Sequence, residues 1–227
     1  MSVQDGLRTV RARLDAACRA AGRDPSTVRL LAASKLHPSD AVRAAWAEGQ
    51  RLFGESRPQE LRDKALELAD LDLEWHFIGG LQKNKIKYVV GRAALIHSVG
   101  DLDLAAAIDE RAQAQGLVQP VLVQVHIGGE GSKGGVEPAV ALELCHAVAA
   151  LPGLALRGLM SLPPWDDDPD QMRPYHQELR ALAQAGRSAG LPLHELSMGM
   201  SDDIEPAVAE GATIIRVGTA IFGARPG

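Results

Sequence analysis

The sequence predicts an α/β protein, built as a single (β/α)8 barrel of the TIM type with an extra N-terminal helix. Three observations lead to this class. Eight short apolar runs alternate with segments of helical spacing, glycines mark the ends of several of those segments, and 227 residues is a common length for a barrel. An open doubly wound sheet is the main competitor. It usually has fewer strands and a glycine-rich turn after the first one, where this chain has Lys35.

The elements follow in a regular order. A first helix is expected from about residue 5 to residue 21, ending at Gly22, a residue type common at helix C-termini. Strands are expected at residues 28–34, 51–55, 74–79, 94–99, 120–127, 155–162, 193–199 and 213–218. No low-complexity linker divides the chain. We therefore expect one domain over residues 1–227, with the extra helix in residues 1–22 and the barrel in residues 28–227.

Composition narrows the class of protein. The formal charge of −5 gives no support to nucleic-acid binding, which usually needs a basic surface. Cys18 and Cys145 have no partners at metal-ligand spacing and are interpreted as inert buried thiols in a reducing compartment. No apolar run is long enough to span a bilayer, and the N-terminus lacks a secretory core. These features predict a soluble, cytoplasmic protein that binds neither nucleic acid nor membranes.

Unusual residues gather where the predicted strands end, which is the working face of such barrels. The loops after the seventh and eighth strands contain "SMGMS", with Ser197, Gly199 and Ser201, and "GTAIFG", with Gly218 and Thr219. Backbone amides and hydroxyls in these loops often bind phosphate. A helix cap is expected in either case, in which Asp202 or Ser201 caps the next helix and Glu205 completes a capping box, and a cap without a phosphate site is the alternative.

Lys35 ends the first strand, in the stretch "LLAASK". An amine in a partly dry site can form a Schiff base with an aldehyde or ketone. The alternative is a structural lysine at the rim, or one paired with Glu55. Beside a phosphate site, Lys35 suggests a ligand with a carbonyl at one end and a phosphate at the other. Pyridoxal 5′-phosphate (PLP) and a sugar phosphate both fit, and the second would indicate a Schiff-base aldolase.

Arg216 lies in the last strand, two residues before Gly218, and is expected on the same face. A guanidinium inside a barrel needs an acceptor. A pyridine nitrogen of PLP is one option, and an ion pair with a neighbouring carboxylate is the other.

The chain resembles the pyridoxal phosphate homeostasis protein family, single-domain relatives of the alanine racemase N-terminal barrel. The matching stretches run in the family's order from residue 30 to residue 225: "LLAASK", "RLFGE", "LEWHFIGGLQKNK", "HSV", "GLMSL", "LSMGMSDD" and "IRVGTAIFGAR". The resemblance implies a barrel of PLP fold type III. It also implies PLP held covalently, as an internal aldimine on Lys35, with Arg216 facing the pyridine nitrogen.

The resemblance assigns further site residues. Its phosphate-binding residues would be Ser197, Met198, Gly199, Met200, Ser201, Gly218 and Thr219. Its pocket-lining residues would be His76, Ile78, Met160 and Ser161. Ser56 stands where the family usually has asparagine, a residue that would contact the PLP ring or its aldimine bond to the lysine. Ser132 and Lys133 lie in "GSKGG", close to the family's "NSKSG", and are candidate ligand-loop residues.

The expected role is binding, storage and transfer of PLP, with no strong catalysis and no catalytic residues. A racemase needs a second proton-transfer group, which a tyrosine from a separate domain supplies in the related racemases. This chain has only Tyr88 and Tyr175, both in segments that read as helices. A PLP-dependent racemase-like enzyme remains the alternative within this cofactor class. The resemblance also favours a monomer, with PLP-dependent apo-enzymes as possible recipients.

Two further clusters have simple interpretations. His76, His97 and His126 lie near strand ends, but their spacing matches no metal motif, so pocket or core histidines are favoured and no metal is predicted. Lys83, Lys85 and Lys87 are interpreted as a solvated helix face, with a docking or second cofactor-binding patch as the alternative.

Overall fold

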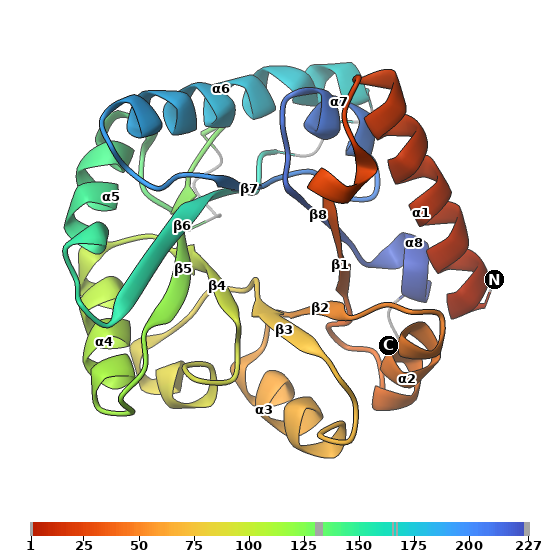
Figure 1. Ribbon diagram of the computed structural model, residues 1–227, viewed down its shortest axis with the longest axis horizontal. Helices are drawn as coiled ribbons and strands as arrows, with labels where there is room; N and C mark the ends of the chain where they lie inside the picture. The colour runs from red at the N-terminus through yellow and green to blue at the C-terminus, as the bar shows by residue number, and fades with distance from the viewer. Residues whose placement is uncertain (1, 130–133, 165, 167, 225–227) are drawn as a thin grey trace.

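The computed structural model describes residues 2–129, 134–164, 166 and 168–224. Within them, eight parallel strands close into a barrel in chain order, and helices surround it (Figure 1). The strands are β1 (Arg29–Ala33), β2 (Leu52–Glu55), β3 (Glu74–Phe77), β4 (Leu95–Val99), β5 (Gln119–Val125), β6 (Leu154–Ser161), β7 (Glu195–Ser197) and β8 (Ile214–Val217). The predicted barrel is confirmed, and each strand overlaps its predicted range.

The α-helices alternate with these strands as predicted. They are α1 (Val3–Ala20), α2 (Ser39–Ala47), α3 (Pro58–Glu67), α4 (Leu102–Gln113), α5 (Ala141–Ala149), α6 (Pro169–Ser188), α7 (Ile204–Ala209) and α8 (Thr219–Phe222). The described residues also form three short 3-10 helices: η1 (Pro25–Thr27), η2 (Lys83–Tyr88) and η3 (Pro138–Val140). Gly22 has a φ of 66° just beyond α1, which explains why that helix ends there.

The first and last strands form the closing seam of the barrel. In their register Leu31 lies opposite Arg216, and Ala32 lies opposite Val217. The seam therefore places the end of β1, where Lys35 follows, beside the end of β8, where Gly218 follows. Residues almost two hundred positions apart in the sequence become neighbours.

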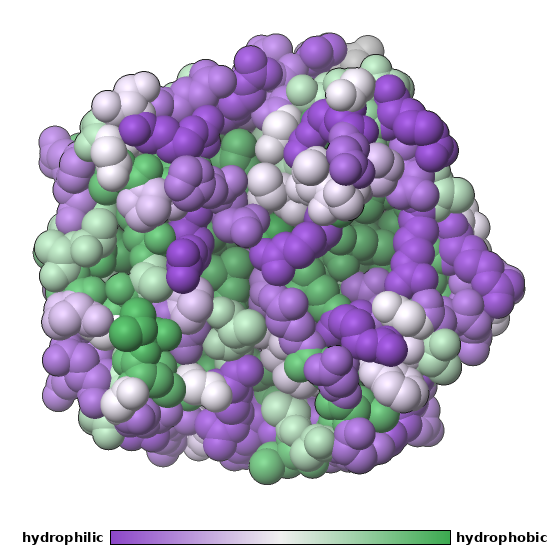
Figure 2. Space-filling model, in the orientation of Figure 1, coloured by the Kyte–Doolittle hydropathy of each residue, from purple (hydrophilic) through white to green (hydrophobic). Residues whose placement is uncertain are grey.

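The core has two parts because successive strand residues point to opposite faces of the sheet. The larger part lies between the strands and the helices and contains Ala32 and Met198. The smaller part fills the barrel interior and consists of Leu31, Ala33, Leu52, Leu95, Leu122, Met160 and Ile214, with Ile78 and Leu162 against it. Figure 2 shows hydrophilic residues over much of one face, with apolar residues visible between them near its centre.

Helix α1 packs beside α7 and α8 (Figure 1). A Cβ atom on Gly6 would lie 2.7 Å from the carbonyl oxygens of Ala220 and Ile221, so only glycine permits this approach. Arg13 forms an ion pair with Glu205 at 2.6 Å and donates to the Ser201 carbonyl oxygen at 2.5 Å. The predicted extra helix is thus attached to the loops that follow β7 and β8.

The predicted capping box at α7 is wrong. The N-cap residue is Asp203, whose side chain makes no capping bond to the helix, and Glu205 binds Arg13. The Glu205 carboxylate, which the local sequence pattern assigned to the capping box, instead forms an ion pair with Arg13 of α1. Among the described residues, no helix is long and apolar enough to cross a membrane.

Candidate functional site

A pocket of about 280 Å³ lies at the carboxyl ends of the strands and includes residues from both sides of the seam. Its lining residues all lie at or just beyond strand ends: Ala33, Lys35, Ile78, Leu162, Met200, Ser201, Asp202, Arg216, Gly218 and Thr219. Seven of the predicted site residues are in this set. The amine, the guanidinium and the two hydroxyl-bearing loops that the sequence analysis singled out therefore share one cavity.

Lys35 is half-buried and follows β1 directly. The next residue, Leu36, has a φ of 66°, a left-handed conformation that costs a bulky side chain about 1–2 kcal/mol. Its amide donates a 2.6 Å hydrogen bond to the Glu60 carboxylate of α3. The chain turns sharply beside the lysine, and a side chain from the neighbouring helix holds the turn.

Residue Ser34, on the other side of Lys35, is held by the same network. The Lys64 ammonium of α3 donates at 2.8 Å to the Ser34 carbonyl oxygen, to Glu55 and to Glu60. The Ser34 hydroxyl donates at 2.6 Å to Glu55. Both neighbours of Lys35 are thus held by charged groups, Ser34 by the buried Lys64 and Glu55 and Leu36 by the half-buried Glu60, which limits the positions that the Lys35 backbone can adopt.

Glu55 is fully buried, and burial raises the pKa of its carboxyl group, although Lys64 opposes the shift. The alternative interpretation of Lys35, as the partner of Glu55, is wrong. One Glu55 oxygen is bound by Lys64 and Ser34, and the other has no hydrogen-bond partner in the described structure. The buried Glu55 of β2 is therefore the ion-pair partner of Lys64 of α3.

Arg216 reaches the pocket from the barrel interior and is 5% exposed. Its guanidinium donates at 2.6 Å to the Ser197 hydroxyl and at 2.8 Å to the Ser161 carbonyl oxygen. Within the described ranges it pairs with no carboxylate, so the ion-pair interpretation is wrong. Burial lowers the pKa of Arg216 to about 10, which leaves the group charged at neutral pH.

The loop after β7 approaches the pocket closely because of a glycine. Gly199 has a φ of 86°, and a Cβ there would lie 2.5 Å from Ala207 and 2.8 Å from Ile215. The Met200 amide donates at 2.6 Å to Asp203, whose other carboxylate oxygen binds His176 at 2.9 Å. A buried pair therefore shapes the loop that carries Ser201.

The loop after β8 continues directly into α8. Gly218 precedes the helix, and Thr219 is its first residue. The first amides of a helix have no acceptor inside that helix, so they are available to an anion in the pocket.

Three predicted site residues lie deeper than expected. Ser197 was expected at a phosphate, but its fully buried hydroxyl contacts His97 and Arg216. Met198 points to the outer core, since it alternates with Ser197 along the chain, so only its backbone can face a ligand. His76 bonds to His97 and Glu74 inside the barrel, away from the pocket lining.

The remaining predicted residues are placed as follows. Met160 fills the barrel interior, and the Ser161 hydroxyl is buried with no partner in the described structure. Ser56 lines a separate cavity of about 790 Å³, beside Leu36 and α3. Ser132 and Lys133 lie outside the described residues.

The other clusters do not gather into a site. His126 bonds to Glu137, away from the other two histidines, and no group of metal-binding side chains occurs among the described residues. In the lysine cluster, Lys83 pairs with Asp103, whereas Lys85 and Lys87 lie over the ring of Tyr88 in η2.

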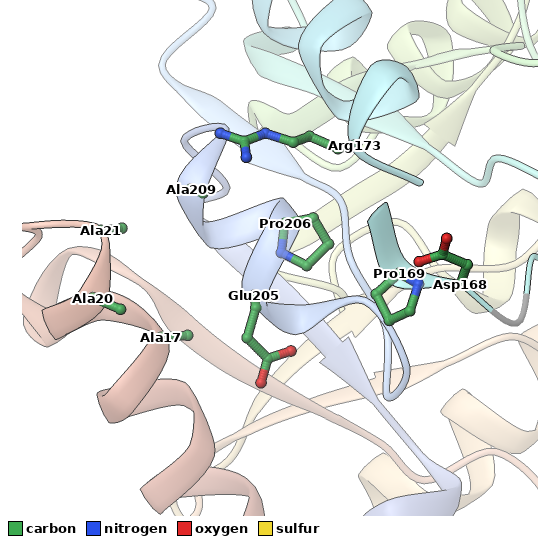
Figure 3. Close-up of a pocket in the computed structure, with 9 residues that line it drawn as sticks. All are labelled: Ala17, Ala20, Ala21, Asp168, Pro169, Arg173, Glu205, Pro206 and Ala209. Carbon is green, nitrogen blue, oxygen red and sulfur yellow. The ribbon is translucent and has the colours of Figure 1, made fainter. Parts of the chain in front are cut away.

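A groove on the outer surface lies between α1, α6 and α7 (Figure 3). Its apolar side includes two alanines of α1 and the alanine at its C-cap, and Glu205 and Arg173 approach it from the other helices. Arg13 binds Glu205, and Glu210 binds Arg173, so both charges are engaged within the chain. It contains none of the predicted site residues.

The fold and the site define a class of protein: a closed parallel barrel with a lysine after its first strand that shares a pocket with a buried arginine and with the loops after its last two strands. The family model described as "Alanine racemase, N-terminal domain" matches residues 7–226. The barrel is thus of the alanine racemase type, as the sequence predicts.

Full-length relatives define the family more narrowly. The pyridoxal phosphate homeostasis protein of Aquifex aeolicus is 45% identical over 226 residues, covering 99% of both chains. That of Pseudomonas aeruginosa is 44% identical, covering 99% of this chain and 96% of its own. The structure of PipY from Synechococcus elongatus with PLP bound has a TM-score of 0.86 and 37% identity, covering 98% of this chain and 100% of that one. The chain belongs to the pyridoxal phosphate homeostasis protein family.

Proposed function

We propose that this protein binds PLP in the pocket between β1 and β8 and acts in the homeostasis of that vitamin B6 cofactor, working as one domain. The observation that carries the proposal is the meeting of Lys35 and Arg216 in one cavity with the loops of Ser201 and Thr219. Support comes from relatives named pyridoxal phosphate homeostasis proteins and from the PLP-bound structure of PipY.

The chemistry of the pocket fits the three parts of PLP. The Lys35 amine suits the aldehyde, and a Schiff base there would form a C=N bond with loss of one water molecule. The hydroxyls of Ser201 and Thr219 and the amides of Gly218 and α8 suit the phosphate. Arg216 would face the pyridine nitrogen, and its positive charge would keep that nitrogen unprotonated.

The walls of the pocket suit the ring. Ile78, Leu162 and Met200 supply apolar surface in the same cavity. The Ser161 hydroxyl, buried without a partner in the described structure, is available to a polar group deeper in the pocket.

We propose a carrier without strong catalysis. The tyrosines support this view: Tyr88 lies in η2 among Arg62, Lys85 and Lys87, and Tyr175 lies in α6. Neither lines the pocket, so neither is placed to transfer a proton to a bound amino acid. Apo-enzymes that use PLP would be its recipients, and it would act as a monomer in the cytoplasm.

The test compares wild type with Lys35→Ala, and uses Lys83→Ala, an exposed lysine, as the matched control. After incubation with PLP and reduction by borohydride, we expect visible absorbance before reduction and one added phosphopyridoxyl group by intact mass in wild type and the control. Lys35→Ala should show neither. A colourless wild type that gains no mass would refute PLP binding at Lys35 and would favour the Schiff-base aldolase, which needs no cofactor.

The same samples test the carrier role. Incubation with L-alanine or L-lysine should produce no racemised or decarboxylated product above the Lys35→Ala background. Rapid racemisation that depends on Lys35 would replace the carrier with the racemase-like alternative.

A further inference from the structure

A hydrogen-bonded chain of five side chains crosses the barrel interior. Glu74 contacts His76 at 2.9 Å, and His76 contacts His97 at 2.9 Å. His97 contacts the Ser197 hydroxyl at 2.9 Å, which accepts from Arg216 at 2.6 Å. Glu74 is the first residue of β3 and is partly exposed, whereas Arg216 lines the pocket at the other end of the barrel. The three side chains between them are almost fully buried.

The two ends of the chain fix the direction of every hydrogen bond. A guanidinium only donates, and an ionised carboxylate only accepts. When both rings are neutral, the ionised Glu74 accepts from His76, so the nitrogen of His97 that faces Ser197, Nδ1, must accept the hydroxyl hydrogen of Ser197. The proton of His97 then lies on Nε2 and is donated to Nδ1 of His76. His76 in turn donates from Nε2 to Glu74.

This arrangement requires both histidines to be neutral. Burial lowers the pKa of His76 and lowers that of His97 well below its usual value, while the hydrogen bond from His76 lowers the pKa of Glu74. A second proton on His76 would lie on Nδ1 and face the Nε2–H of His97, and a second proton on His97 would lie on Nδ1 and face the hydroxyl hydrogen of Ser197. A single tautomer, with the proton on Nε2 of both rings, satisfies all four contacts.

The charged groups around the chain are consistent with this state. Arg29 of β1 pairs with Glu74 at 3.1 Å and with Glu195 of β7 at 3.4 Å. At the other end, the charge of Asp203 acts on Arg216 and favours its cationic form. Both positive groups disfavour a proton on the histidines between them. Glu74 and Glu195 favour a proton on His76, but burial is the largest effect and lowers its pKa.

We propose that His76 and His97 are positioning residues for Arg216. They orient the Ser197 hydroxyl so that it accepts from the guanidinium, which fixes the guanidinium toward the pocket. Because every link between Arg216 and Glu74 is neutral, the arginine keeps its positive charge for an anionic or aromatic nitrogen-containing ligand. The expected effect of the two histidines on PLP binding rests on the proposed function, whereas the proposed protonation of their rings does not.

The first test needs no ligand. Nitrogen-15 NMR of the full-length protein, labelled at histidine, reports which ring nitrogen carries the proton. His76→Gln and His97→Gln identify the two sets of signals. At pH 7 we expect both rings to be neutral with the proton on Nε2. A charged ring, or a proton on Nδ1 of either, would overturn the hydrogen-bond direction and with it the proposal.

The second test measures the effect on PLP. His97→Phe keeps an aromatic ring and removes both nitrogens, and we expect a dissociation constant for PLP about tenfold higher, with a shifted absorbance of the bound form. His97→Gln, which keeps an acceptor and a donor, should recover part of the loss. Lys35 should still gain the phosphopyridoxyl group after borohydride, since its own contacts are unchanged. His146→Phe, at an exposed position of α5, is the control.

The outcomes separate the two proposals. Unchanged affinity and absorbance in His97→Phe would refute the positioning role while leaving PLP binding intact. Failure of wild type to bind PLP would refute the proposed function. The histidine tautomers measured by NMR would still show whether the hydrogen bonds between Glu74 and Arg216 run in the proposed direction. If His97→Phe does not fold, His76→Phe breaks the chain one hydrogen bond further from Arg216, and the same change in absorbance is expected.

Discussion

Replacing Lys64 by methionine tests the network that holds the backbone on both sides of Lys35. The Lys64 side chain is 7% exposed and donates to three oxygens at 2.8 Å. Methionine keeps the length and the apolar stem of the side chain but leaves the fully buried Glu55 without its cation. Breaking one partner of a buried ion pair costs about 3–5 kcal/mol. We therefore expect the free energy of unfolding to fall by about 3 kcal/mol at neutral pH.

The loss should depend on pH in a defined direction. Burial already raises the pKa of Glu55 above its usual 4.5, and removal of Lys64 should raise the pKa further. Below pH 4.5 the carboxyl group is protonated in both states, and its charge adds no penalty. Above that value the unfolded chain releases the proton while the folded variant retains it, so the variant loses stability as the pH rises. The defect should be larger at about pH 8 than at about pH 5.

Urea unfolding monitored by circular dichroism measures these changes. Glu55→Gln combined with Lys64→Met should recover part of the loss, since the buried charge is gone. Lys83→Met, which removes an exposed ion pair, should change stability by less than about 0.5 kcal/mol. A loss below about 1 kcal/mol in Lys64→Met, or a loss that is equal at both pH values, would refute the reasoning.

Two further predictions concern packing and thiol reactivity. Gly6→Ala should lower the free energy of unfolding by about 1–3 kcal/mol, because its Cβ would lie 2.7 Å from the Ala220 carbonyl oxygen. Gly80→Ala, which has open space around its Cβ, is the control and should not lower it. Equal urea midpoints for the two variants would contradict this prediction. Burial raises the pKa of Cys145 to about 12 and also raises that of Cys18. At pH 8 iodoacetamide should therefore modify neither thiol in the folded protein but both in urea. Rapid alkylation of the folded protein would show that these thiols are not inert.

The architecture was predictable because each strand carries its own local signal. Buried parallel strands read as short apolar runs, and the glycines after the intervening helices mark where each one ends. The strand ranges therefore hold to within about two residues at most boundaries. The segment between β3 and β4 forms the 3-10 helix η2 where an α-helix was the natural expectation from "LQKNKIKY".

The candidate site was predictable only in part. Strand ends identify which residues share the pocket, so Lys35, Arg216, Gly218 and Thr219 could be grouped from the sequence. Depth within the barrel could not be read in this way. Ser197 carries the same hydroxyl whether it faces a phosphate or a buried arginine, and the choice depends on His97, a hundred residues away.

The α3 residues Lys64 and Glu60 were missed altogether. They stand in a helix of largely polar sequence, where a lysine and a glutamate four residues apart are typical of a solvated face. Their role follows from the packing of α3 beside the end of β1, which brings them to the Ser34 carbonyl oxygen and the Leu36 amide. Nothing in the local pattern distinguishes them.

The seam between β1 and β8 has a consequence for biosynthesis. Ala33, Lys35 and Ile78 of the cavity wall are made early by the ribosome, and the other lining residues follow in the later part of translation. Among the strand pairs, β1 with β8 has the greatest loop-closure entropy. A nascent chain that has not yet produced β8 can expose the Lys35 amine but cannot enclose a ligand around it. Binding of PLP should therefore occur only after the fold is complete. Prematurely terminated copies of the chain would not remove PLP from the cell's free supply.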